Sequence, residues 1–254
     1  MITIKTKEEI EVLKQGGKIL AEVLRELAKL AKPGVSTGFL NEKAKELVLS
    51  YGAKPAFEGY RPSFSKKPYP AAICISLNEV VVHGLPSDSV ILKEGDILKL
   101  DFGVTYEKLI TDAAITIGIG KMTDEKTKLI NATKRALELA IEEIKSGNHI
   151  GDIGFVVEQY IKSQGLSVVR DLVGHGVGYK VHEEPNIPNY GKRGEGPILK
   201  SGMVLAIEPI VTVGSGQVRL GKDGFGYETI DGSLSAHFEH TVAVTEDGSD
   251  ILTK

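Results

Sequence analysis

The chain has 254 residues, 26% of them charged and 41% hydrophobic, and its formal net charge is −3. This balance is typical of a soluble globular protein and excludes a general attraction to nucleic acid or to an anionic membrane surface. No apolar run approaches the ~18 residues that cross a bilayer, and the acidic start is unlike a secretory signal. The single cysteine, Cys74, excludes an internal disulfide. We therefore expect a cytoplasmic protein.

The first half of the chain begins with two helical patterns and continues with strands. Thr6 and Glu9 form a T-x-x-E capping box, and apolar residues then follow helical spacing as far as the KPG at residues 32–34. A second helix is predicted from about Ser36 to Gly52. Apolar and β-branched runs predict strands at 72–77, 79–83, 96–104 and 109–117.

A similar order begins again in the second half, with helices predicted at about 123–145 and 152–163. A shift of 113 residues matches the glycines that end the helices of the two halves. The stretch LKEGDILKLDFGV (92–104) also aligns without gaps with LKSGMVLAIEPIV (199–211). Two separate similarities in the same order indicate an internal repeat.

We therefore interpret residues 1–254 as a single α+β domain, with an internal repeat of approximately 6–118 and 123–246. The two halves would be related by a pseudo-twofold axis and would face each other across a curved antiparallel sheet covered by helices. The alternative is a chance resemblance of amphipathic segments.

In the alignment of the two halves, Asp101 corresponds to Glu208, so each half has an acidic residue at the same position of an otherwise apolar strand. Asp101 and Asp112 lie 11 residues apart on a predicted hairpin. With a turn near Tyr106–Glu107 they would be directly opposite, with Cβ atoms only ~5 Å apart. Two buried carboxylates at that distance repel each other strongly.

Glu239, within SAHFEHTVAV, is a fourth acid embedded among predicted strand residues, on the same face as His237 and Thr241. Such acids could instead face solvent at a sheet edge or pair with cations, although these strands supply few cations beyond Lys99. Two divalent metal ions would neutralise the four carboxylates and allow their burial.

Histidines complete the set of candidate ligands. His175 lies between two glycines in GHGVGYKVHEEP, His182 follows seven residues later, and His83 ends the run NEVVVHG. Each alone is also explained as a surface or structural histidine. Carboxylates with one imidazole suit Mn²⁺, Fe²⁺, Co²⁺ or Zn²⁺ in a dinuclear centre, which activates water near neutral pH. The reaction class that follows is hydrolysis, of peptides or of phosphate esters.

The motifs NEVVVHG, GHGVGYKVHEEP, VLAIEPIV and LSAHFEHTVAVTEDG, in this order, resemble those of type I methionine aminopeptidases over essentially the whole chain. The resemblance implies the pita-bread fold and removal of the initiator methionine from nascent proteins, with preference for a small second residue. It implies two divalent metal ions (Co, Mn, Fe or Zn) and a bridging hydroxide that attacks the first peptide carbonyl. The implied metal ligands are Asp101, Asp112, His175, Glu208 and Glu239.

The resemblance also assigns roles to further residues. Glu208 would transfer protons, His182 would donate a hydrogen bond to the developing oxyanion, and His83 would contact the substrate amide. One monovalent cation is expected near Asn78, Val80 and Ser235.

The implied methionine pocket departs from the family pattern. Tyr69 and Cys74 match pocket positions, whereas Val181 stands where phenylalanine is usual and Phe225 where tryptophan is common. A missing contact of this size costs about 1–3 kcal/mol. We expect a retained preference for methionine in a wider pocket that also admits leucine or norleucine side chains.

Two alternatives lie close to this interpretation. A creatinase or Xaa-Pro dipeptidase relative would share the fold and the five ligands but usually has an additional N-terminal domain. A non-catalytic peptide- or ribosome-binding protein would have lost ligand positions. The expected partners are N-terminal methionine peptides and nascent polypeptides, with transient ribosome contact. We expect no sequence-specific nucleic acid or membrane partner, and a monomer.

Overall fold

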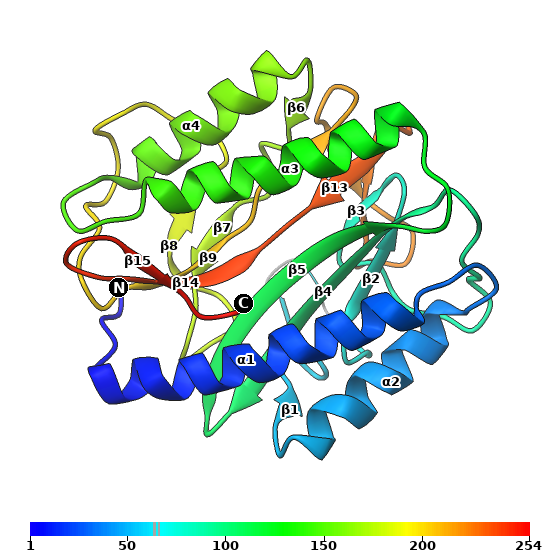
Figure 1. Ribbon diagram of the computed structural model, residues 1–254, viewed down its shortest axis with the longest axis horizontal. Coiled ribbons are helices and arrows are strands. Elements are labelled where there is room, and N and C mark those ends of the chain that lie inside the picture. Colours follow the sequence, from blue (N-terminus) through cyan, green and yellow to red (C-terminus); the bar gives the residue numbers. More distant parts are fainter. Residues whose placement is uncertain (63–64, 66) are drawn as a thin grey trace.

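The computed structural model describes residues 1–62, 65 and 67–254. The helices of this part of the chain form two pairs (Figure 1), and they are α1 (Lys7–Leu30), α2 (Thr37–Ser50), α3 (Asp124–Glu142) and α4 (Ile150–Ser163). The predicted capping box is confirmed, because the Thr6 hydroxyl accepts from the Glu9 amide and the Glu9 carboxylate accepts from the Thr6 amide. None of these described helices is long and apolar enough to cross a membrane.

The strands between and behind the helices in Figure 1 are mostly short and antiparallel. In the first half they are β1 (Lys54–Pro55), β2 (Cys74–Leu77), β3 (Val80–Val82), β4 (Ile97–Tyr106) and β5 (Leu109–Gly118). In the second half they are β6 (Ser167–Val168), β7 (Gly174–Gly176), β8 (Glu183–Ile187), β9 (Val204–Ile207), β10 (Ile210–Thr212), β11 (Val218–Leu220), β12 (Tyr227–Thr229), β13 (Ser235–His237), β14 (His240–Val244) and β15 (Ser249–Ile251).

The long β4–β5 hairpin joins β2 and β1 in one sheet, while β9 lies between β14 and β7 in a five-stranded sheet. The two sheets meet where Ala114 of β5 exchanges backbone hydrogen bonds with Glu239, just before β14. These contacts bring the acidic residues of the two halves together.

Strand β4 shows how the helices position the site. Leu98, Leu100 and Phe102 are fully buried in the apolar cluster that α1 and α2 form with this strand. Because successive strand residues point to opposite faces, Lys99 and Asp101 point away from the helices, toward the second half. A second apolar cluster joins α3 and α4 to β9 and β10.

The two halves contain matched contacts at positions that the predicted repeat pairs. The Gly34 amide donates to Leu92, and the Gly147 amide donates to Leu199 in the same way. Isolated β-bridges also join Ser36 to Ile91 and His149 to Ile198. That residues 1–254 form a single domain with this internal repeat stays a proposal.

Candidate metal centre and active site

Asp101 and Asp112 are both buried on the same face of the β4–β5 hairpin, but they are not directly opposite. Asp101 faces Ala114, and Asp112 faces Gly103. The predicted register was wrong by two residues because the turn is Glu107–Lys108, with φ of 45° and 73°, the conformation of a type I′ hairpin. A shift of two residues preserves the face, so the carboxylates remain diagonal neighbours.

Glu239 lies at a break between β13 and β14 rather than inside a continuous strand. Its backbone is held by Ala114, whose side chain lies opposite Asp101. Two residues later, the Thr241 hydroxyl accepts from the Asp112 amide at 2.8 Å and donates to the Asp112 carbonyl at 2.7 Å. These bonds fix Glu239 beside both aspartates.

His175 reaches the acids from β7, and its flanking glycines allow neighbouring strands to approach. A Cβ on Gly174 would lie 2.5 Å from the Ala206 carbonyl oxygen, and one on Gly176 would lie 2.3 Å from the Glu184 carbonyl oxygen. The His175 Nδ1 is 2.9 Å from the Gly176 carbonyl oxygen. Since a carbonyl only accepts, Nδ1 carries the proton and Nε2 offers its lone pair to a ligand.

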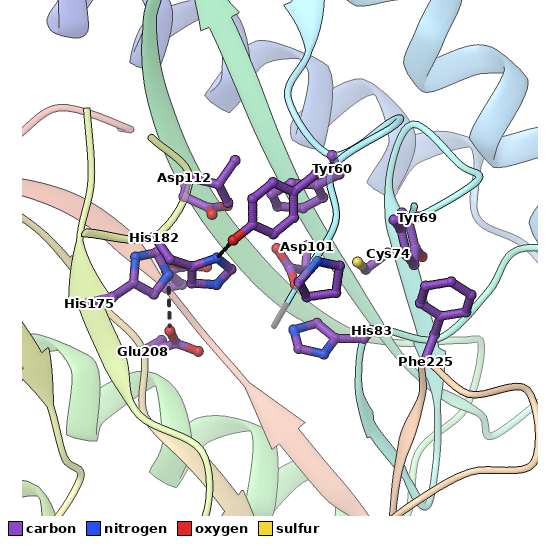
Figure 2. Close-up of a pocket in the computed structure, with 14 residues that line it drawn as sticks. Tyr60, Tyr69, Cys74, His83, Asp101, Asp112, His175, His182, Glu208 and Phe225 are labelled. Carbon is purple, nitrogen blue, oxygen red and sulfur yellow. Dashed lines mark hydrogen bonds and ion pairs between the residues drawn. The ribbon is translucent and has the colours of Figure 1, made fainter. Parts of the chain in front are cut away.

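Glu208, between β9 and β10, faces two imidazoles. Its carboxylate oxygens lie 3.5 Å from His175 Nε2 and 3.4 Å from His237 Nε2 (His175 in Figure 2). His237 is also 4.0 Å from Glu239. The sequence predicted that His237 shares a strand face with Glu239, but it assigned no role to this histidine. Its position two residues before Glu239 was the only indication that it belongs to the site.

Burial sets the charge state of this cluster in the metal-free protein. It raises the pKa of Asp112 to about 7, and it raises the pKa of Asp101, Glu208 and Glu239 well above the ordinary carboxyl range, with further contributions from the neighbouring carboxylates. Burial also lowers the pKa of His175 to about 3. The imidazole is therefore neutral at physiological pH, as a metal ligand must be, and burial disfavours the simultaneous ionisation of the acids.

The residues fit divalent metal ions. One ligand atom from each of Asp112, His175 and Glu239 lies within 4.8 Å of the others. Among the described residues, Asp112 Oδ1 and Glu239 Oε1 are buried and accept no hydrogen bond. Buried carboxylate oxygens without partners are costly, and oxygen-rich sites with imidazole suit first-row divalent ions.

His182 stands at the mouth of the same pocket, where its Nδ1 is 2.8 Å from the Tyr60 hydroxyl (Figure 2). The neighbouring Glu183 holds the loop of His182 in position. The Glu183 carboxylate accepts hydrogen bonds from the backbone amides of residues 179–180 and from Lys5 Nζ, the last at 2.7 Å. Although the ring is partly open to solvent, the surrounding protein lowers the pKa of His182. Tyr60 was not found from the sequence.

His83 follows β3 in a left-handed conformation, with φ of 59°. A positive φ is uncommon outside glycine and is often found at functional sites. The ring lies in the pocket with His182 and packs edge-on near Tyr227, with ring centroids 5.9 Å apart. Burial lowers the pKa of His83 to about 4, so this imidazole is neutral as well.

All four predicted methionine-pocket residues line one wall of the cavity, and Cys74 and Phe225 lie beside Tyr69 in Figure 2. Tyr69 donates to the Gly84 carbonyl at 2.9 Å and meets Phe225 edge-to-face, with centroids 5.4 Å apart. Cys74 is the cross-strand neighbour of Asp101. The apolar wall therefore adjoins the acids directly.

Phe57 also lines this wall and was not predicted. A Cβ on Gly103 would lie 2.5 Å from its ring. Gly103 faces Asp112 across the hairpin, so the missing side chain there makes room for the aromatic ring. The glycine in LDFGV was the only local signal for this contact.

Asn78, Val80 and Ser235, expected near a monovalent cation, also lie together. The Ser235 hydroxyl lies 2.9 Å from the Asn78 carbonyl oxygen and 3.5 Å from that of Val80. The ammonium of Lys99, however, contacts both Asn78 and Ser235.

Comparison with known proteins shows the family to which the chain belongs. The model of "Metallopeptidase family M24" matches residues 11–246. A methionine aminopeptidase of Clostridium acetobutylicum is 46% identical over 253 residues, covering 100% of this chain and 99% of the relative. The chain belongs to the type I methionine aminopeptidases of metallopeptidase family M24. The crystal structure of the methionine aminopeptidase from Thermotoga maritima has a TM-score of 0.96 at 44% identity, with 100% of both chains covered.

The methionine aminopeptidase assignment confirms the pita-bread fold and the expectation of a metallo-aminopeptidase. A prolidase from Pyrococcus furiosus shares the fold, with a TM-score of 0.78 at 27% identity. The match covers 99% of this chain but 65% of the prolidase chain. The likeness to methionine aminopeptidases is therefore much closer in both sequence and extent.

Proposed function

We propose that this enzyme removes the initiator methionine from nascent proteins, with preference for a small second residue. The proposal is supported by one pocket that joins the acid and histidine cluster to an apolar wall. An apolar wall suits the flexible, polarisable methionine side chain. The first peptide bond of such a substrate would then lie beside the acid and histidine cluster.

Asp101, Asp112, His175, Glu208 and Glu239 would hold two divalent metal ions. The ions would supply activated water at neutral pH and charge to polarise the substrate carbonyl. Glu208 would take a proton from the water and pass it to the leaving nitrogen. Burial raises the pKa of its carboxyl, which favours the protonated form that such a transfer requires.

His182 would stabilise the negative charge that develops on the carbonyl oxygen. If the Tyr60 hydroxyl donates to Nδ1, the proton of the neutral ring lies on Nε2. That tautomer presents an N–H donor to the substrate, which is the arrangement that oxyanion stabilisation requires. His83, in the same pocket, would contact the substrate amide.

Hydrolysis of Met-Ala-Ser, Met-Leu-Ser and an Xaa-Pro peptide by the metal-loaded protein tests the proposal. We expect release of methionine from Met-Ala-Ser, slow cleavage of Met-Leu-Ser, and none of the Xaa-Pro peptide. Cleavage of the Xaa-Pro peptide with Met-Ala-Ser left intact would favour the dipeptidase alternative. Action as a cytoplasmic monomer, with transient ribosome contact, stays a prediction.

A further inference from the structure

The side chain of Lys99 is buried in an unusual setting for a cation. It is 1% exposed and points from β4 to the same side as Asp101. In the part of the chain that the structure describes, its hydrogen bonds go to neutral oxygens and not to a carboxylate. A buried ammonium normally requires either a counter-ion or a full set of acceptors.

Three oxygen atoms supply that set. Lys99 Nζ donates to the Asn78 carbonyl at 2.8 Å, the Ser235 hydroxyl at 2.9 Å and the Ser235 carbonyl at 3.2 Å. An ammonium has three N–H donors, so each acceptor is matched by one proton. Burial lowers the pKa of Lys99, whereas the negative charge of Glu79 raises it. The three acceptors also favour the charged form of the side chain.

Other bonds hold the acceptors in place independently of the lysine. Asn78 has a φ of 50°, its side-chain oxygen accepts from the Ile97 amide at 2.9 Å, and its side-chain nitrogen donates to Asp96 at 3.0 Å. The Ser235 amide donates to the Asn78 carbonyl at 3.1 Å. The oxygens therefore converge because of the backbone around them, as in sites for monovalent ions built from carbonyls.

A monovalent cation does not fit here together with Lys99. Such an ion was expected near Asn78, Val80 and Ser235, and two of these residues supply the oxygens that the ammonium already contacts. An ion at the same oxygens would displace the ammonium. If both stayed, the two like charges would repel each other in a buried setting.

We propose that Lys99 is a built-in substitute for a monovalent cation, so that this enzyme neither binds nor requires K⁺ or Na⁺ at this position. The ammonium connects the turn before β3 with β13. Strand β3 leads to His83, and β13 leads to Glu239. It thereby holds together two segments that flank the metal centre, with a covalently attached charge in place of an exchangeable ion.

Thermal unfolding of the metal-loaded protein tests this proposal with a readout separate from catalysis. Melting temperatures are compared at pH 6.5 in potassium, sodium and tetramethylammonium chloride of equal ionic strength. We expect the wild type to melt at the same temperature in all three. Lys99→Ala should melt lower in tetramethylammonium chloride and recover part of the loss, saturably, with K⁺ or Na⁺, because the vacated oxygens can then bind an ion.

Two further variants sharpen the comparison. Lys99→Met fills the space with an apolar chain, so its loss of melting temperature should not be recovered by either ion. Lys29→Ala removes a lysine whose side chain is 70% exposed, and it should respond to salts as the wild type does. A saturable rise of the wild-type melting temperature in K⁺ or Na⁺ would overturn the proposal, as would a Lys99→Ala response no larger than that of Lys29→Ala.

Diffraction provides a second measurement that does not depend on the stability of the variants. Wild-type crystals soaked in rubidium chloride should show no anomalous peak in contact with the carbonyl oxygens of Asn78 and Ser235. A rubidium peak at those two oxygens in the wild type would contradict the substitution of the ion by Lys99. Neither measurement uses substrate, so the outcome is independent of the proposed methionine specificity.

Discussion

Replacing Tyr60 by phenylalanine tests whether this hydroxyl orients His182 for catalysis. The change removes one 2.8 Å hydrogen bond while retaining the ring. Such a bond contributes about 0.5–1.5 kcal/mol, which corresponds to roughly a 2- to 13-fold change in rate at 1.36 kcal/mol per factor of ten. Removal of an oxyanion donor itself costs about 10²–10³ in kcat, which is the loss that we expect for His182→Ala.

The assay is the initial rate of methionine release from Met-Ala-Ser by metal-loaded protein. Tyr60→Phe should lower kcat within that smaller range with little change in KM, since the bond matters most when charge develops. Tyr51→Phe, at the exposed end of α2, serves as the matched control. Because Tyr60 acts through His182, adding Tyr60→Phe to His182→Ala should cost nothing further. A wild-type kcat for Tyr60→Phe, or an additional loss in the double variant, would refute this reasoning.

Three further predictions concern the metal ligands and the pocket. Asp112→Asn should abolish both divalent metal binding and hydrolysis, and persistent activity would contradict a metal mechanism. Leu-Ala should be cleaved more slowly than Met-Ala but measurably, and Val181→Phe should increase the discrimination; a wild-type preference for methionine of many hundredfold would exclude a widened pocket. The raised pKa of Asp112, about 7, and the lowered pKa of His175, about 3, predict that metal uptake at pH 6 releases carboxyl protons but none from this imidazole. Metal affinity should then fall as the pH is lowered from 7 to 5. Calorimetry measures this affinity at each pH, and its dependence on the ionisation enthalpy of the buffer measures the protons released. An affinity that is independent of pH would contradict the prediction.

Features that depend on local periodicity could be predicted from the sequence. The capping box at Thr6 and the strand predicted at 96–104 each involve residues close together in the chain, so a one-dimensional pattern contains them. The acids Asp101 and Asp112 were placed on the correct face for the same reason, because an error of two residues in the hairpin register does not change the face.

Features that depend on turn geometry or on distant contacts could not be predicted. Glu107 and Lys108 occupy positive φ without the glycine or asparagine that usually indicates a type I′ turn, so the register was misplaced. The contact of Tyr60 with His182 spans 122 residues. The bond from Lys99 to the Ser235 hydroxyl spans 136 residues, and no periodic pattern relates such pairs.

The number of divalent ions bound per chain tests the central claim most directly. Metal-free protein is dialysed against Mn²⁺ or Co²⁺, and bound metal is measured by elemental analysis on the same samples that are assayed with Met-Ala-Ser. The buried cluster of four carboxylates and His175 predicts up to two ions per chain, with activity that appears as metal binds. Methionine release that persists in chelated protein, or a chain that retains no more metal than Asp112→Asn, would contradict the account.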